Sequence, residues 1–155
     1  MSRTQFDNID RKILSFLSAN ARTPFLEIAR ECGVSGAAIH QRVQKLVAAG
    51  IIESFQTNVS PEAIGYETCS YIGFFLTDPT GYGEVVERLK EIPEIVECHF
   101  TTGKYDLLVK LYARNNDHLL SLLHGPLQAV GAGRTETLIS FKQEFRRPLS
   151  VKQED

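Results

Sequence analysis

Residues 23–50, TPFLEIARECGVSGAAIHQRVQKLVAAG, decide the fold of the N-terminal part of the chain. The stretch opens with a capping threonine and a first-turn proline, and Gly33 stands where a helix ends in the left-handed conformation. A single residue separates that glycine from Ser35, a second capping residue. The spacing therefore predicts two helices joined by a very tight turn, with the second helix ending at Gly50.

The residues on either side extend this pattern. Asp7 is a candidate helix cap, because its carboxylate can accept from free backbone N–H groups, and apolar residues follow it at helical spacing. After Gly50 the run IIESFQTNV, residues 51–59, is typical of a strand. We therefore predict an α+β protein whose residues 1–60 form a winged-type helix-turn-helix domain with a short linker strand.

The outward face of the helix over residues 35–50 carries no acidic residue. On a helical wheel the apolar side chains gather on the other side, namely Ile39, Val43, Leu46 and Val47. The outward glutamine, alanine and basic side chains match what the major groove of DNA requires, since they can pair with adenine, touch thymine methyl groups and reach phosphates. The alternative is a surface helix that happens to lack acids. The candidate DNA-binding residues are Ser35, Ala37, Ala38, Gln41, Arg42, Gln44 and Lys45.

The composition is that of a folded protein, with 43% hydrophobic and 23% charged residues. The net charge is −2, but residues 1–60 hold seven Lys or Arg against five Asp or Glu, whereas residues 61–155 hold ten against fourteen. The basic excess therefore lies in the N-terminal part. No apolar stretch approaches the roughly 20 residues that cross a bilayer, and Cys32, Cys69 and Cys98 form no paired motif. We expect a cytoplasmic location, no membrane association and no disulfide framework.

Residues 61–155 alternate between strand and helix patterns. The run ETCSYIGFFLT, residues 67–77, has apolar residues at both odd and even positions, so this strand needs cover on both faces. A helix pattern over residues 85–92 follows, and then two strand patterns separated by the pair Gly103 and Lys104. A further helix and a last strand complete the order βαββαβ. This order predicts a ferredoxin-like domain over residues 61–155, with both helices on one face of a four-stranded antiparallel sheet and the other face free for a partner.

The last two elements have recognisable ends. Asn116 or Asp117 can cap the second helix of this domain. Gly125 and Pro126 are expected to kink or interrupt that helix. The last strand is predicted over ETLISFKQEF, residues 136–145.

From Asp7 to about Phe145 the chain resembles the Lrp/AsnC family, the leucine-responsive and asparagine-responsive transcriptional regulators of bacteria and archaea. Five segments match in order: FDNIDRKILSFLSANAR, EIARECGVS, AIHQRVQKLVAAGIIESF, TTGKYDLLVKL and GRTETLISF. The resemblance implies a sequence-specific regulator that binds double-stranded promoter DNA and responds to a small effector, an amino acid in this family, through a RAM-type C-terminal domain. It also implies a homodimer built by sheet-to-sheet packing that assembles further into tetramers, octamers or hexadecamers. Of these we expect the octamer, and we expect no cofactor.

The resemblance places the effector near the glycine-containing hairpin. Backbone N–H groups at a glycine turn can bind the carboxylate of an amino acid, and Asp106 can pair with its ammonium group. The alternative is that Gly103 only permits the turn, while Tyr105 and Asp106 stabilise the hairpin. The candidate effector-binding residues are Thr102, Gly103, Tyr105, Asp106, Ile139 and Ser140.

An enzyme is the rival function, because some proteins that resemble this family are haem-precursor decarboxylases. Catalysis requires convergent acid and base groups, and the four histidines lie in different predicted elements or on different faces: His40, His99, His118 and His124. We therefore predict no catalytic residue and no metal site. A third interpretation, an effector-sensing assembly protein without DNA binding, is disfavoured by the acid-free outer face of residues 35–49.

Overall fold

The computed structural model describes residues 7–151, and the chain divides into two compact units. The first unit comprises the residues up to Asn58 together with those from Phe145 onward, and is referred to as the helical unit. The second spans Val59–Glu144 and is referred to as the sheet unit. The predicted boundary at residue 60 lies next to the observed one, but the last residues of the chain belong to the helical unit.

The helical unit contains the three predicted helices, α1 (Asn8–Ala19), α2 (Phe25–Cys32) and α3 (Gly36–Ala48). Asp7 caps α1 by accepting from the backbone N–H of Asp10. Gly33 ends α2 in the left-handed conformation, with φ +66°, and the Ser35 side chain caps α3. The helices enclose one core, made by Ile13, Leu14, Leu17, Ile28, Ala29, Ile39, Val43 and Leu46.

Three local predictions for this unit are wrong. Pro24 occupies the cap position of α2, and the Thr23 hydroxyl donates to the Asn20 carbonyl instead of capping that helix. Val47 is 46% exposed and does not join the core side of α3. Residues 51–59 form neither a strand nor a wing, because the described part of this unit offers no second strand with which their backbone could pair.

The C-terminal segment, residues 145–151, also departs from the predicted domain of residues 61–155. It has no regular secondary structure. Pro148 and Leu149 lie beside α1, and Val151 packs against the core of the helical unit. Such a contact joins distant parts of the chain, so hydrophobic periodicity could not reveal it.

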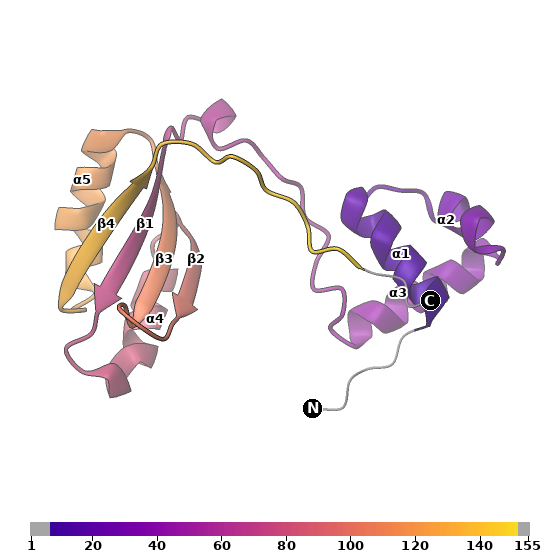
Figure 1. Cartoon of the computed structure of the whole chain (residues 1–155), viewed down its shortest axis with the longest axis horizontal. Coiled ribbons are helices and arrows are strands. Elements are labelled where there is room, and N and C mark those ends of the chain that lie inside the picture. The colour runs from indigo at the N-terminus through magenta and orange to yellow at the C-terminus, as the bar shows by residue number, and fades with distance from the viewer. Residues whose placement is uncertain (1–6, 152–155) are drawn as a thin grey trace. The chain divides into compact units, whose positions relative to one another are not determined.

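The sheet unit contains four antiparallel strands in the order β2-β3-β1-β4 (Figure 1), which confirms the ferredoxin-like fold. The strands are β1 (Thr68–Phe75), β2 (Ile95–Phe100), β3 (Leu107–Ala113) and β4 (Arg134–Ser140). The helices are α4 (Tyr82–Lys90), α5 (Asn116–His124) and α6 (Pro126–Ala129), with 3₁₀ turns at Glu62–Ile64 and Pro79–Gly81.

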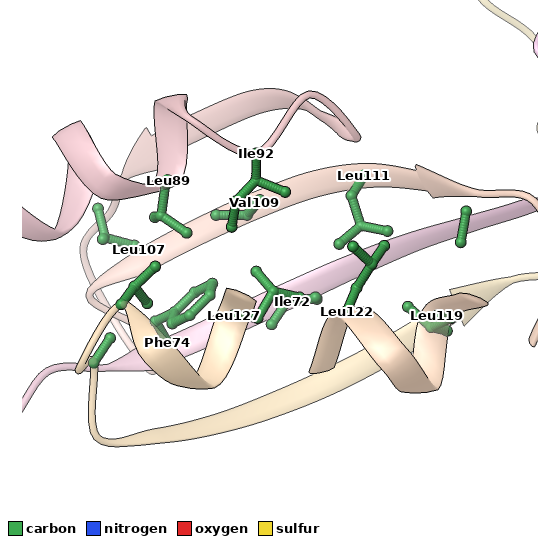
Figure 2. Close-up of a cluster of buried hydrophobic side chains, with 13 residues drawn as sticks. Ile72, Phe74, Leu89, Ile92, Leu107, Val109, Leu111, Leu119, Leu122 and Leu127 are labelled. Atoms are coloured by element: carbon green, nitrogen blue, oxygen red, sulfur yellow. The ribbon is translucent and has the colours of Figure 1, made fainter. Parts of the chain in front are cut away.

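One face of the sheet and the helices share a single hydrophobic core. Ile72 and Phe74 of β1 point into it together with Leu89 of α4 and Leu122 of α5 (Figure 2). Full burial of each such side chain contributes on the order of 2 kcal/mol. The helices therefore cover one face, as predicted. The odd-numbered residues of β1, beginning with Cys69, lie on the opposite face, which we name the open face.

The ends of several elements differ from the predictions. Asn115 caps α5, one residue before the two candidates. Gly125 ends α5 and Pro126 begins α6, which confirms the interruption. The last strand stops at Ser140. This residue pairs with Cys69 near the start of β1, and beyond it β1 offers no further pairing partner. No helix within residues 7–151 is long and apolar enough to cross a membrane.

Candidate DNA-binding and effector sites

The exposed surface of α3 is the candidate DNA interface. Its core side chains fix the helix, so that the predicted residues lie together on the outside: exposed Ala37, Gln41, Gln44 and Lys45, and half-buried Ala38. The Ser35 hydroxyl accepts from the backbone N–H of Ala38 at 3.1 Å and so completes the first turn. Because α3 contains no aspartate or glutamate, this surface presents no negative side chain of its own to a polyanion.

Arg42 differs from the other candidates, because its guanidinium lies against the start of α1. Its Nη1 is 2.8 Å from Oδ2 of Asp7 and 2.8 Å from Oδ1 of Asp10. The hydrogen bonds with Asp10 and then Asp7 raise the pKa of Arg42. The pKa of Asp7 is lowered, first by the Asp10 backbone N–H and also by Arg42. The side chain of Arg42 therefore connects α3 to the N-terminus of α1.

His40 is an exposed residue of α3 that the sequence did not place among the candidates. Its Nε2 lies 3.4 Å from Nε2 of Gln44, one helical turn further on. Its ring centroid lies 5.8 Å from that of Phe25 in α2. The spacing of His40 and Gln44 could have identified this neighbour of the candidate surface.

The β2–β3 hairpin carries the first group of candidate effector residues. A backbone hydrogen bond of 3.0 Å between Thr101 and Asp106 closes it, so the loop is longer than the predicted pair Gly103 and Lys104. Gly103 has φ +96°, a backbone conformation that residues other than glycine rarely adopt. Thr102 and Gly103 are exposed, which leaves the tip of the hairpin open to a ligand.

Asp106 connects this hairpin to the end of β1. Its Oδ2 accepts from the backbone N–H of Leu76 at 2.8 Å, and its own N–H donates to the Phe74 carbonyl at 2.9 Å. The carboxylate therefore has a structural partner through one of its two oxygens. This contact favours the interpretation in which Asp106 stabilises the hairpin. The other carboxylate oxygen, Oδ1, could still accept a hydrogen bond from a ligand.

Tyr105 lies against β1 at Gly73. A Cβ added to Gly73 would be 2.3 Å from Cδ1 of the Tyr105 ring, so only glycine leaves room for it. The Tyr105 hydroxyl donates to Oε2 of Glu136 at 2.9 Å. The sequence placed Gly73 only as a strand residue, and it did not reveal Glu136.

Glu136 of β4 joins three side chains into what we name the hairpin cluster. Lys104 Nζ lies 2.5 Å from Oε2 of Glu136, and Arg134 Nη2 lies 2.9 Å from Oε1. Hydrogen bonds from Lys104 and Tyr105 lower the pKa of Glu136, and the bond to Glu136 raises the pKa of Lys104. No motif could signal this cluster, because it joins segments that lie far apart in the sequence.

Ile139 and Ser140, the other effector candidates, lie away from the hairpin. Ser140 pairs with Cys69 at the start of β1, whereas Asp106 contacts Phe74 near its end. Five strand residues span about 17 Å. Ile139 and Ser140 are adjacent on a strand and point to opposite faces. Within one chain, the structure therefore does not bring them together with the hairpin residues.

The open face of the sheet combines aromatic side chains with a buried cation. Lys110 is 6% exposed, and its Nζ lies 5.9 Å from the ring of Tyr71, 5.5 Å from that of Tyr112 and 3.6 Å from Oε1 of Glu97. Burial acts to lower the pKa of Lys110, but the two tyrosines and the carboxylate raise it above its ordinary value. Leu138 pairs with Tyr71 on this face and is 56% exposed. A large exposed apolar side chain beside half-buried aromatic rings is typical of an interaction surface.

The histidines and cysteines remain apart. Cys98 pairs with Val109 and His99 with Leu108, so their side chains lie on opposite faces of the sheet. Within the part of the chain that the structure describes, no group of three or more His, Cys, Asp or Glu side chains could hold a metal ion.

Two family models match the chain. An AsnC-type helix-turn-helix domain matches residues 6–47, and an Lrp/AsnC ligand binding domain matches residues 71–149. The first match contains all of α1 and α2 and most of α3. The second contains nearly the whole sheet unit and the beginning of the C-terminal segment.

Individual relatives agree with these matches. The regulatory protein AsnC of Escherichia coli is 36% identical over 150 residues, 96% of this chain and 99% of the relative. The HTH-type transcriptional regulator FL11 of Pyrococcus furiosus is 35% identical over 136 residues, 88% of this chain and 89% of the relative. The solved structure of E. coli AsnC has a TM-score of 0.88 and covers 94% of this chain and 99% of its own.

A more distant structure shares the fold. A transcriptional regulator of Neisseria meningitidis, solved as a complex with L-methionine, has a TM-score of 0.87 at 20% identity, over 96% of this chain and 97% of its own. Two matched domains in the same order, relatives that cover nearly the whole chain, and a common architecture all agree. The chain therefore belongs to the Lrp/AsnC family of transcriptional regulators, with a helix-turn-helix DNA-binding domain and a ligand-binding domain.

Proposed function

We propose that this regulator reads promoter DNA through α3, and that an amino acid bound at the sheet unit changes its affinity for that DNA. The observation that carries the first part is the exposed, acid-free surface of α3. Gln41 and Gln44 have the side chains that pair with adenine, and Lys45 can reach guanine or phosphate. The short link from Gly33 to Ser35 is the tight turn of a helix-turn-helix motif, in which the second helix enters the major groove.

The remaining candidates on α3 have supporting roles in this proposal. Ala37 and Ala38 leave room for close approach to the bases, and Ser35 fixes the first turn. Arg42 holds α3 against Asp7 and Asp10 rather than reading a base. With so few long side chains at the start of α3, sequence preference would depend partly on DNA shape.

The effector part of the proposal rests on the hairpin and on the relatives. The exposed turn at Gly103 suits a carboxylate, and the second oxygen of Asp106 suits an ammonium group. The N. meningitidis regulator in complex with L-methionine supports an amino acid as the ligand. Because Ile139 and Ser140 lie at the far end of β4, they would contribute from a neighbouring subunit.

The open face of the sheet is the proposed subunit interface. The open face, with Tyr71, Tyr112 and exposed Leu138, suits a second copy of the same face, and dimers of this kind would assemble further toward an octamer. We propose action by binding alone, without catalysis, since the relatives are named as regulators. A regulator that acts on promoter DNA would work in the cytoplasm, and we include this location in the proposal.

Fluorescence anisotropy with a labelled duplex from the protein's own upstream DNA tests the DNA part. We expect Lys45→Gln to weaken binding about tenfold and to lower the slope of log affinity against log salt by about 1. Lys90→Gln is the control, because it also removes the charge of an exposed lysine, but from α4 of the sheet unit. Unchanged binding by Lys45→Gln would refute the assignment of α3.

A further inference from the structure

The C-terminal segment, residues 145–151, brings two basic side chains into the helical unit. It follows the sheet unit in sequence but belongs to the helical unit by its contacts. Arg146 and Arg147 are exposed, and neither forms an ion pair with a carboxylate of the described residues. The nearest acid in sequence, Glu144, pairs with Lys142 at 3.2 Å. The two guanidinium groups are therefore available to an external anion.

One apolar contact, made by half-buried Val151, links the segment that carries these arginines to the helical core, whereas Leu149 is 92% exposed. Pro148 and Leu149 line a groove of about 410 Å³ together with Leu14 and Leu17 of α1. Val151 packs against the core of the helical unit, to which Leu14 and Leu17 belong. Because the contact of Val151 restrains the backbone beyond the arginines, less conformational entropy is lost when their side chains bind a ligand.

The segment also changes the charge of the helical unit. With residues 145–155 included, this unit holds ten Lys or Arg against seven Asp or Glu, and without Arg146 and Arg147 it would hold eight against seven. The sheet unit holds seven against twelve. The two arginines therefore supply most of the positive excess of the unit that contains α3.

We propose that Arg146 and Arg147 are a second DNA-contacting element, which binds backbone phosphates while α3 enters the major groove. This rests on the proposed binding of DNA by α3. The planar fork of arginine matches a phosphate group, and contacts to phosphates fix the position of a protein without reading the sequence. The two arginines therefore add affinity and salt dependence, and leave the preference between sequences unchanged.

The test is the salt dependence of DNA binding by the full chain, measured by anisotropy on an upstream duplex and on a scrambled duplex. Arg146→Gln and Arg147→Gln are each expected to lower the log–log slope by about 1, and the double variant by about 2. The loss should be equal on both duplexes. Lys142→Gln is the matched control, because it removes an exposed cation only four residues upstream, in the sheet unit, and should leave the slope unchanged.

A variant at Val151, the residue that packs the segment against the core, separates placement from charge. Val151→Ser adds no charge, and it should lower the slope as the double arginine variant does, although both arginines remain. A wild-type slope in the double variant overturns the proposal, and so does an equal fall with Lys142→Gln, which would indicate a general charge effect. A loss confined to the upstream duplex would indicate base reading and would overturn the phosphate assignment. If instead α3 does not bind DNA, Lys45→Gln will bind DNA as the wild type does, so this outcome is distinguished from failure of the arginine proposal.

Discussion

The ring of Tyr105 occupies the space that a side chain at Gly73 would need, with its Cδ1 at 2.3 Å from the position of an added Cβ. The same ring lies 5.4 Å from Phe75, and its hydroxyl donates to Glu136. One side chain of the hairpin therefore contacts both β1 and β4. A change at any of these positions should disturb the candidate effector site and the sheet together.

Gly73→Ala should lower the free energy of unfolding of the sheet unit by about 1–3 kcal/mol, because the added methyl group must displace the Tyr105 ring. Urea denaturation measures this loss. Gly83→Ala in α4 is the control, since nothing lies within 4 Å of its added Cβ. In a Tyr105→Ala background the cost of Gly73→Ala should largely disappear. An equal cost in both backgrounds would show that the ring contact is not its cause.

Arg42→Gln should destabilise the helical unit by about 0.5–1.5 kcal/mol, since it removes two partly exposed ion pairs that join α3 to α1. Thermal unfolding followed by circular dichroism measures the change. Lys45→Gln should leave the melting temperature unchanged, because Lys45 is exposed. If Arg42→Gln melts like the wild type but binds DNA poorly, Arg42 contacts DNA directly.

Asp7 should make the helical unit sensitive to acid. Its pKa is lowered in the folded state, so its carboxylate stabilises the fold above the unfolded pKa, near 3.9, and this stabilisation is lost as the pH falls through the lower folded value. Asp7→Asn keeps a good helix cap but cannot titrate. The wild type should therefore melt at a higher temperature than Asp7→Asn at pH 6, and this difference should shrink below about pH 4. A difference that is independent of pH would contradict the role of the carboxylate.

Local signals were sufficient for most of the fold. Gly33 and Ser35 set the tight turn before α3, and Gly125 with Pro126 divides α5 from α6, because capping and backbone conformation depend on neighbouring residues. Apolar residues at both odd and even positions of β1 indicated a strand that needs cover on both faces. The helices cover one face, and cover of the other face by a partner stays a prediction. These signals act within a few residues and can be read without the structure.

Contacts between distant residues could not be predicted in this way. The ion pairs of Arg42 join positions 35 and 32 residues apart, and the bond from Tyr105 to Glu136 spans 31. Val151 reaches a core that begins at Ile13. Residues 51–59 have strand composition, but a strand forms only where a neighbour offers hydrogen bonds. Propensity alone therefore predicted one strand too many.

Asp106→Asn separates the two interpretations of the hairpin. The amide oxygen can still accept from the Leu76 N–H, so the melting temperature should stay close to that of the wild type. The lost negative charge should weaken binding of an amino acid about tenfold or more, measured by isothermal titration with L-methionine and then each other amino acid. Asp106→Ala should reduce both stability and binding. Equal affinity of Asp106→Asn and the wild type would leave this carboxylate a structural role alone.

Leu138→Arg should dissociate the proposed dimer, because it places a strongly hydrated charge in the middle of the open face, beside Tyr71 and on the same face as the cation of Lys110. Leu120→Arg is the control: Leu120 is 53% exposed on α5, close to the 56% of Leu138, but lies away from the open face. Size-exclusion chromatography with light scattering should then give 17.4 kDa, the mass of one chain, for Leu138→Arg and a wild-type multiple for Leu120→Arg. A similar effect of both variants would mean that an exposed charge disturbs assembly wherever it lies. Wild-type mass for Leu138→Arg would place the subunit interface on another surface.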